Sequence, residues 1–95
     1  MYHFIGRNVS VTEKKRTKIT VNIHKKTYTI VGTESKERVE LIAKLIDEKM
    51  NEIYEANKHL DTTRLAVLTA INTMNDYLTL KEDYDELITL LEEDK

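Results

Sequence analysis

The chain has 95 residues and a formal net charge of −2, with 40% hydrophobic residues, only two glycines and no proline. A chain of this length forms one small domain with a limited core, and so few turn-forming residues favour a few long elements over a doubly wound sheet. It contains neither an apolar run of about 18 residues nor a secretory signal, which predicts a cytoplasmic protein without a membrane segment.

Charge is distributed unevenly along the chain. Residues 1–31 carry seven Lys or Arg against one acidic residue, whereas residues 80–95 carry seven Asp or Glu against two lysines. These ends either solubilise the protein or, at the basic end, form a face for an acidic partner. Residues 1–16 show neither helical periodicity nor alternation, and we expect a flexible or loosely docked N-terminal extension.

The segment 17–31 alternates between apolar and polar residues. Ile19, Val21 and Ile23 share one face, and Tyr28 and Ile30 follow with the same period of two, which predicts two strands. The only room for a reversal is around Lys25-Lys26, so the strands form a hairpin with a tight turn. An isolated hairpin is marginally stable, and its apolar face must therefore pack on helices.

Two helices are predicted after the hairpin. The first spans about residues 35–57, has an ordinary one-sided apolar face, and is capped by Thr33 or Ser35. The second begins near residue 62 with Asp61 or Thr62 as its cap. Because only a short loop separates them, we expect the helices to fold back as an antiparallel pair.

The second helix, residues 62–91, is longer than a compact domain of this size is wide. Its first half is apolar around much of its circumference, and from residue 80 a single stripe with 4-3-4 spacing continues as a coiled-coil seam. Self-association is the simplest way to bury this surface. The predicted oligomer interface comprises Leu68, Ile71, Met74, Tyr77, Leu78, Leu80, Tyr84, Leu87 and Leu91.

The predicted fold class is therefore α+β, a β-hairpin followed by two helices, the second long and forming a coiled coil. We divide the chain into an extension (1–16), a globular head (17–60) and the long helix (61–95), whose tail begins at residue 79. Asn72 and Asn75 within the long helix are either partly exposed or bonded to their own helix, or they make a buried polar contact across a subunit boundary.

No enzyme is visible in the sequence. The chain has no cysteine, and His3, His24 and His59 fall in three different elements without metal-ligand spacing. No glycine-rich phosphate loop occurs. We expect no catalytic residue, no metal and no cofactor. A basic hairpin could contact phosphates, but acidic helices and the lack of an aromatic platform argue against nucleic acid.

Several motifs follow one another in the order of these predicted elements. They are residues 18–32 (KITVNIHKKTYTIVG), Glu34-Ser35, residues 46–50 (IDEKM), residues 60–64 (LDTTR) and residues 66–72 (AVLTAIN). In this order and with this layout they resemble the ZapA family, the Bacillus-type members in particular. The resemblance covers about residues 17–90. It implies a shared dimeric head and long helices that pair into an antiparallel tetramer.

The resemblance also implies a partner and a role. ZapA proteins associate with the tubulin-like division GTPase FtsZ, bundle its protofilaments and stabilise the division ring at mid-cell. The partner surface would be the charged residues of the head, here Lys25, Lys26, Lys58, Thr63 and Arg64. Without the resemblance, the alternatives are a self-associating coiled-coil adaptor for another partner or a weak nucleic-acid-binding module.

Overall fold

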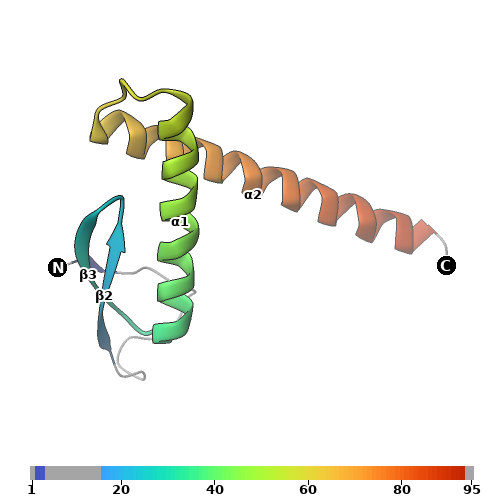
Figure 1. Cartoon of the computed structure of the whole chain (residues 1–95). Helices are drawn as coiled ribbons and strands as arrows, with labels where there is room; N and C mark the ends of the chain where they lie inside the picture. The colour runs from blue at the N-terminus through green and yellow to red at the C-terminus, as the bar shows by residue number, and fades with distance from the viewer. Residues whose placement is uncertain (1, 4–15, 94–95) are drawn as a thin grey trace.

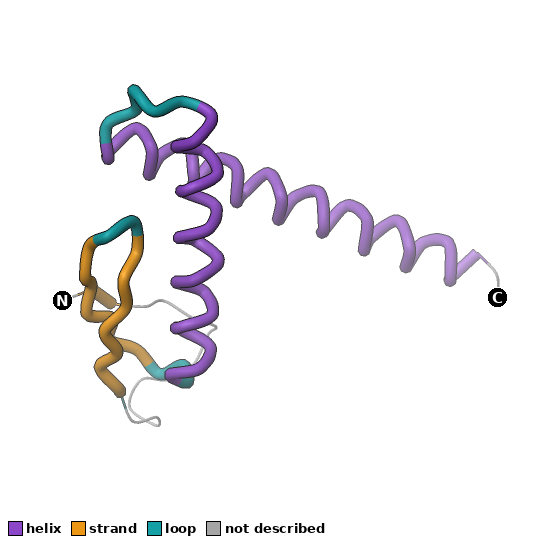
Figure 2. Tube along the Cα trace, viewed as in Figure 1, coloured by secondary structure: helices purple, strands orange, loops and turns teal. Residues whose placement is uncertain are grey.

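Figure 1 shows the computed structural model, which describes residues 2–3 and 16–93. The elements are β1 (Tyr2–His3), β2 (Thr17–Ile23), β3 (Lys26–Gly32), α1 (Lys36–Ala56) and α2 (Thr62–Glu93). The sheet has the order β1-β3-β2, and α1 packs on β2. The predicted α+β fold, a hairpin followed by two helices, is confirmed. Figure 2 shows α2 leading away from the head formed by the sheet and α1.

The core of the head lies between the hairpin and α1. In the antiparallel register Ile19 opposes Ile30 and Val21 opposes Tyr28, so these four side chains share one face of the sheet. Ile19 and Val21 are buried together with Val39 and Ala43 of α1. The inward-facing residues of the strands, which are spaced two apart, thus pack against the apolar face of α1, whose residues recur about every 3.6 positions.

The hairpin turn lies one residue earlier than predicted. Its two central residues are His24 and Lys25, with φ of 50° and 64°, and Lys26 already belongs to β3. Two positive φ values are what a two-residue hairpin of the favoured twist requires. Neither residue is glycine, so each left-handed conformation costs about 1–2 kcal/mol. Surrounding contacts must offset this strain.

The sheet has a third strand that the sequence analysis did not predict. Tyr2–His3, assigned to the flexible extension, pairs in parallel with β3, with Tyr2 opposite Ile30 and His3 opposite Val31. Two residues are too few to show periodicity, so the sequence gives no signal for this strand. They pair here because β3 offers a free edge. The remainder of the predicted extension up to residue 15 lies outside the described residues.

The helix boundaries follow the predicted caps. Ser35 Oγ accepts a hydrogen bond from the Arg38 N–H at 3.2 Å, and α1 begins at the next residue. Asp61 Oδ1 accepts a hydrogen bond from the Arg64 N–H at 2.8 Å, immediately before α2. Both side chains satisfy backbone donors that the first helical turn leaves without partners.

The prediction that the helices form an antiparallel pair is wrong. α2 crosses α1 near its C-terminal end and then extends away from it (Figure 1). Only Leu65 and Thr69 of α2 are buried, and Leu65 is fully enclosed. A short loop fixes which ends of the two helices meet. The angle between them depends on how side chains pack where the helices cross, which helical periodicity does not encode.

An ion pair connects α1 and α2 near the point where they cross. Lys49 Nζ of α1 lies 2.7 Å from Asp76 Oδ2 of α2, and this hydrogen bond raises the pKa of Lys49 above its usual 10.5. Because the folded state has the higher pKa, the stabilisation is complete below pH 10.5 and is lost as pH rises through the raised value.

We therefore expect Asp76→Asn to lower the free energy of unfolding slightly at neutral pH and not at all above the pH at which Lys49 titrates. The effect is small because the pair is exposed to solvent and salt. Urea denaturation across pH measures it. Asp83→Asn is the control, since Asp83 has no ion pair among the described residues. A pH-independent difference between Asp76→Asn and the parent would contradict the prediction.

Candidate functional site

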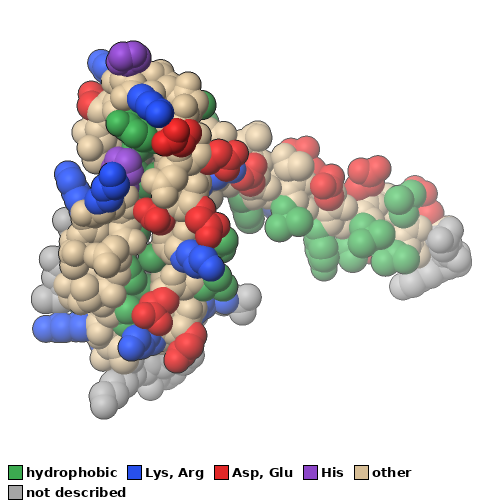
Figure 3. Space-filling model, viewed as in Figure 1, with side chains coloured by type: hydrophobic (Ala, Val, Ile, Leu, Met, Phe, Trp, Pro, Cys, Tyr) green, Lys and Arg blue, Asp and Glu red, His purple; other side chains and the backbone are tan. Residues whose placement is uncertain are grey.

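The large apolar residues of α2 lie on its surface in the single chain. All nine residues of the predicted oligomer interface are exposed, from 36% for Leu68 to 68% for Leu80. Figure 3 shows hydrophobic side chains following one side of the protruding helix while acidic side chains follow another. An exposed apolar surface of this extent is typical of an interaction site.

All of these residues except Leu68 fall, together with some neighbours, into two stripes on α2. The long stripe has alternating spacings of four and three residues and comprises Ala66, Ala70, Thr73, Tyr77, Leu80, Tyr84, Leu87 and Leu91. The short stripe lies beside it and comprises Val67, Ile71, Met74 and Leu78. The half of α2 nearer the head thus presents two apolar sides and the far half mainly one. The long stripe changes from small side chains near the head to large ones beyond it.

A groove opens where the small end of the long stripe meets α1. It has a volume of about 340 Å³ and is lined by Ile46 and Met50 of α1 together with Ala66, Ala70 and Thr73 among the α2 residues. None of these five residues belongs to the predicted oligomer interface. Small side chains leave room for a large apolar side chain from outside.

The predicted partner-binding residues gather at one end of the head. Lys25 lies in the hairpin turn and Lys26 begins β3, while Lys58 lies in the loop before α2 and Thr63 and Arg64 in its first turn. All five are exposed. Figures 1 and 3 show the hairpin turn and the α1–α2 loop toward the same end of the molecule, with basic side chains on both.

The basic residues differ in how far they are neutralised. Lys58 Nζ lies 3.4 Å from a Glu55 carboxylate oxygen, and Arg64 lies 3.9 Å from Asp61. Lys25 and Lys26 have no ion-pair partner within the part of the chain that the structure describes. The hairpin therefore carries the least compensated positive charge of this end.

An apolar hollow adjoins the basic residues of the loop and α2. Leu60, Thr63, Arg64, Val67 and Leu68 line it, and its volume is about 340 Å³. Its exposed lining is apolar, while the Arg64 guanidinium remains exposed beside it. This end can therefore accept an apolar side chain next to an acidic one.

Two residues missed by sequence reasoning hold the hairpin turn against α1. The His24 N–H donates to Asp47 Oδ1 at 2.7 Å, and the His24 ring meets the Tyr54 ring edge-on with centroids 5.7 Å apart. The sequence signal that could have indicated such a support was the turn itself, because residues other than glycine at positive φ need contacts from outside the turn.

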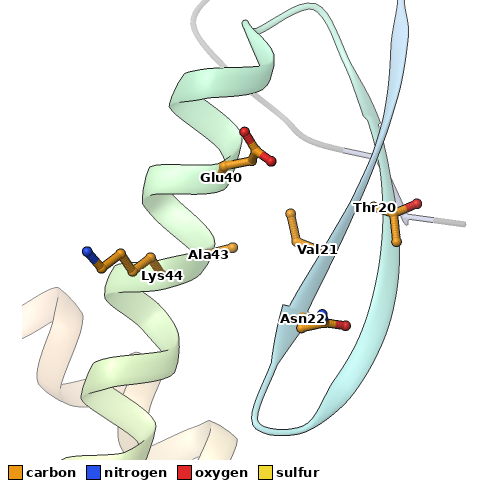
Figure 4. A pocket seen from close by; sticks show the side chains of 6 residues that line it. All are labelled: Thr20, Val21, Asn22, Glu40, Ala43 and Lys44. Atoms are coloured by element: carbon orange, nitrogen blue, oxygen red, sulfur yellow. The ribbon is translucent and has the colours of Figure 1, made fainter.

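The described residues contain no group of side chains suited to hold a metal ion. A hollow of about 250 Å³ between β2 and α1 contains only Glu40 and Lys44 as ionisable residues of its described lining, with Val21 directed toward α1 (Figure 4). Over residues 2–3 and 16–93, no three His, Asp or Glu side chains gather as metal ligands. Neither described helix is long and apolar enough to span a membrane.

The sequence and fold match known proteins. The family model described as "Cell division protein ZapA" matches residues 19–94. The chain belongs to the ZapA family. A cell division protein ZapA from Oceanobacillus iheyensis is 56% identical over 78 residues, 82% of this chain and 91% of that protein. One from Geobacillus sp. (strain WCH70) is 49% identical over 85 residues, 90% of this chain and 98% of that protein.

A solved structure supports the same conclusion. A ZapA mutant dimer from Geobacillus stearothermophilus has a TM-score of 0.66 and 41% sequence identity, covering 90% of this chain and 99% of that one. The predicted family and fold are thus confirmed. ZapA membership places the protein among cell division proteins, a family not known for catalysis.

Proposed function

We propose that this ZapA-family chain is a non-enzymatic protein that binds FtsZ and cross-links its protofilaments at the mid-cell division site. The supporting observation is the separation of two exposed surfaces on one chain. A basic end lies on the head, and an unburied apolar helix extends from it. No cofactor, metal, nucleic acid or membrane is required.

The apolar helix is the self-association surface in this proposal. The related Geobacillus stearothermophilus protein is described as a dimer, and the groove and stripes here expose apolar area that a second copy would cover. The long stripe is self-complementary in the antiparallel sense. About a two-fold axis between residues 78 and 79, Ala70 lies opposite Leu87 and Thr73 opposite Tyr84. The large side chains of the far half would thus meet small ones near the head, while Tyr77 would meet Leu80 at the centre.

The cysteine-free chain allows a direct test of this register. We expect the double variant Ala70→Cys with Leu87→Cys to form intermolecular disulfides under mild oxidation, because antiparallel helices bring these positions together twice. Non-reducing electrophoresis measures the product. The single variants are controls and should cross-link weakly. Equal cross-linking by the single and double variants would rule out the antiparallel register.

The basic end of the head is the proposed FtsZ-binding surface. Arg64 lies in the first turn of α2, where the helix dipole disfavours a cation, and among the described residues Asp61 alone forms an ion pair with it. A basic side chain kept in an unfavourable position supports a role in binding an acidic surface. The uncompensated charge of Lys25 and Lys26 at the same end supports that role further.

The mechanism is multivalency. An assembly with a head at each end carries at least two equivalent binding surfaces, so contacts that are weak individually become avid wherever two filaments run close together. The distance between heads is set by α2, whose 32 residues span about 48 Å. The protein would align filaments without altering their chemistry.

Co-sedimentation with GTP-assembled FtsZ, together with light scattering, tests the proposal. We expect the protein to pellet with filaments and to raise the scattering. No shift of duplex DNA is expected at moderate salt, which distinguishes this function from nucleic-acid binding. An oligomeric preparation that neither pellets with FtsZ nor raises scattering would disprove the proposed function.

A further inference from the structure

The hairpin turn combines a sequence that disfavours its geometry with contacts that enforce it. His24 and Lys25 both adopt positive φ, where glycine or asparagine is the usual residue. Strained backbone of this kind persists only where neighbouring structure fixes it, and it is common at functional sites. Residues outside the turn must therefore hold it in this conformation.

Asp47 and Tyr54 supply the restraint from α1. The Asp47 carboxylate accepts the His24 backbone N–H at 2.7 Å in a partly buried position, and a bond to an ionised acceptor is stronger than a neutral one. The His24 ring packs edge-on against Tyr54, in the last turn of α1. The Nδ1 atom of His24 is buried without a hydrogen-bond partner among the described residues, so the ring is held by packing.

We propose that Asp47 and Tyr54 are positioning residues, which hold the His24–Lys25 turn in its left-handed conformation and so fix where Lys25 is presented to an acidic surface of the partner. Tyr54 lies three residues before the Asn57 cap that begins the α1–α2 loop. The same contacts therefore set the turn relative to Lys58 and Arg64. This inference rests on the proposed function, because the partner surface is that of FtsZ.

The test compares filament binding with the integrity of the head. We expect Asp47→Ala to weaken binding to assembled FtsZ about tenfold, while oligomeric state and helix content stay unchanged. Asp47→Asn keeps an acceptor at the same place and should retain most of the binding. Glu48→Ala, an exposed neighbour on α1, is the matched control and should bind like the parent.

A rescue separates positioning from general destabilisation. Asparagine tolerates the left-handed conformation, so adding His24→Asn to Asp47→Ala should restore binding although the Asp47 contact is still missing. Unchanged binding of Asp47→Ala, where reversing Lys25 and Lys26 to glutamate weakens binding, would overturn the positioning role and leave the function standing. Normal binding by the charge-reversed variant would remove the hairpin from the binding surface and likewise overturn only the positioning role. Failure of the parent protein to pellet with FtsZ would overturn the proposed function itself.

Discussion

The variant Leu87→Asp is expected to lose filament bundling while it still binds filaments. Leu87 lies on the long stripe and is 54% exposed in the single chain, so the substitution leaves the head intact. In the proposed assembly the same side chain is enclosed beside Ala70, where a carboxylate without a partner costs about 3 kcal/mol or more. Association through the tail should weaken at least about a hundredfold.

Sedimentation equilibrium and light scattering with FtsZ measure the two effects separately. Thr79→Asp is the matched control, because it adds the same charge to α2 outside both stripes and should change neither assembly nor bundling. Normal bundling by Leu87→Asp would show that the tail is not the cross-linker. Loss of filament binding together with bundling would show that the head alone does not bind.

The double variant Lys25→Glu with Lys26→Glu is expected to show the opposite pattern. Both side chains are exposed and lack ion-pair partners among the described residues, so their reversal should leave assembly and folding unchanged. Against an acidic partner, two attractive contacts become repulsive, and we expect at least about a tenfold loss of affinity for filaments. The remaining binding should also depend less on salt.

Co-sedimentation at two ionic strengths checks this prediction. Lys36→Glu with Lys44→Glu is the control, because it makes the same change in net charge on α1 at exposed positions away from the turn. If both double variants lose the same affinity, the effect is one of net charge and not of the hairpin. If neither loses affinity, the binding surface lies elsewhere.

Local sequence signals determined much of this fold. Alternation gave the two strands, and Ile19 and Val21 lie in the core as expected. Ser35 and Asp61 cap the helices, and Asn72 bonds Leu68 O of its own helix at 2.9 Å, one of the two predicted alternatives. Caps, alternation and helical periodicity depend on residues within a few positions of each other, which is why one sequence reveals them.

Features that depend on contacts between distant residues were not predictable in this way. The turn moved to His24–Lys25 because strand register, not turn preference, set it, and its support comes from Asp47, 23 residues away. The short strand β1 pairs with the edge that β3 offers, and the crossing of α1 and α2 depends on packing between residues far apart in the sequence.

The sequence by itself thus determined the family, the order of elements and a long helix with more apolar surface than one chain can bury. The tertiary structure decided which part of that surface stays exposed. Leu65 and Thr69 are buried, while a groove remains beside Met50. The fold also brings the hairpin turn toward the same end as the loop before α2. Periodicity records that a face is apolar, whereas only packing decides what covers it.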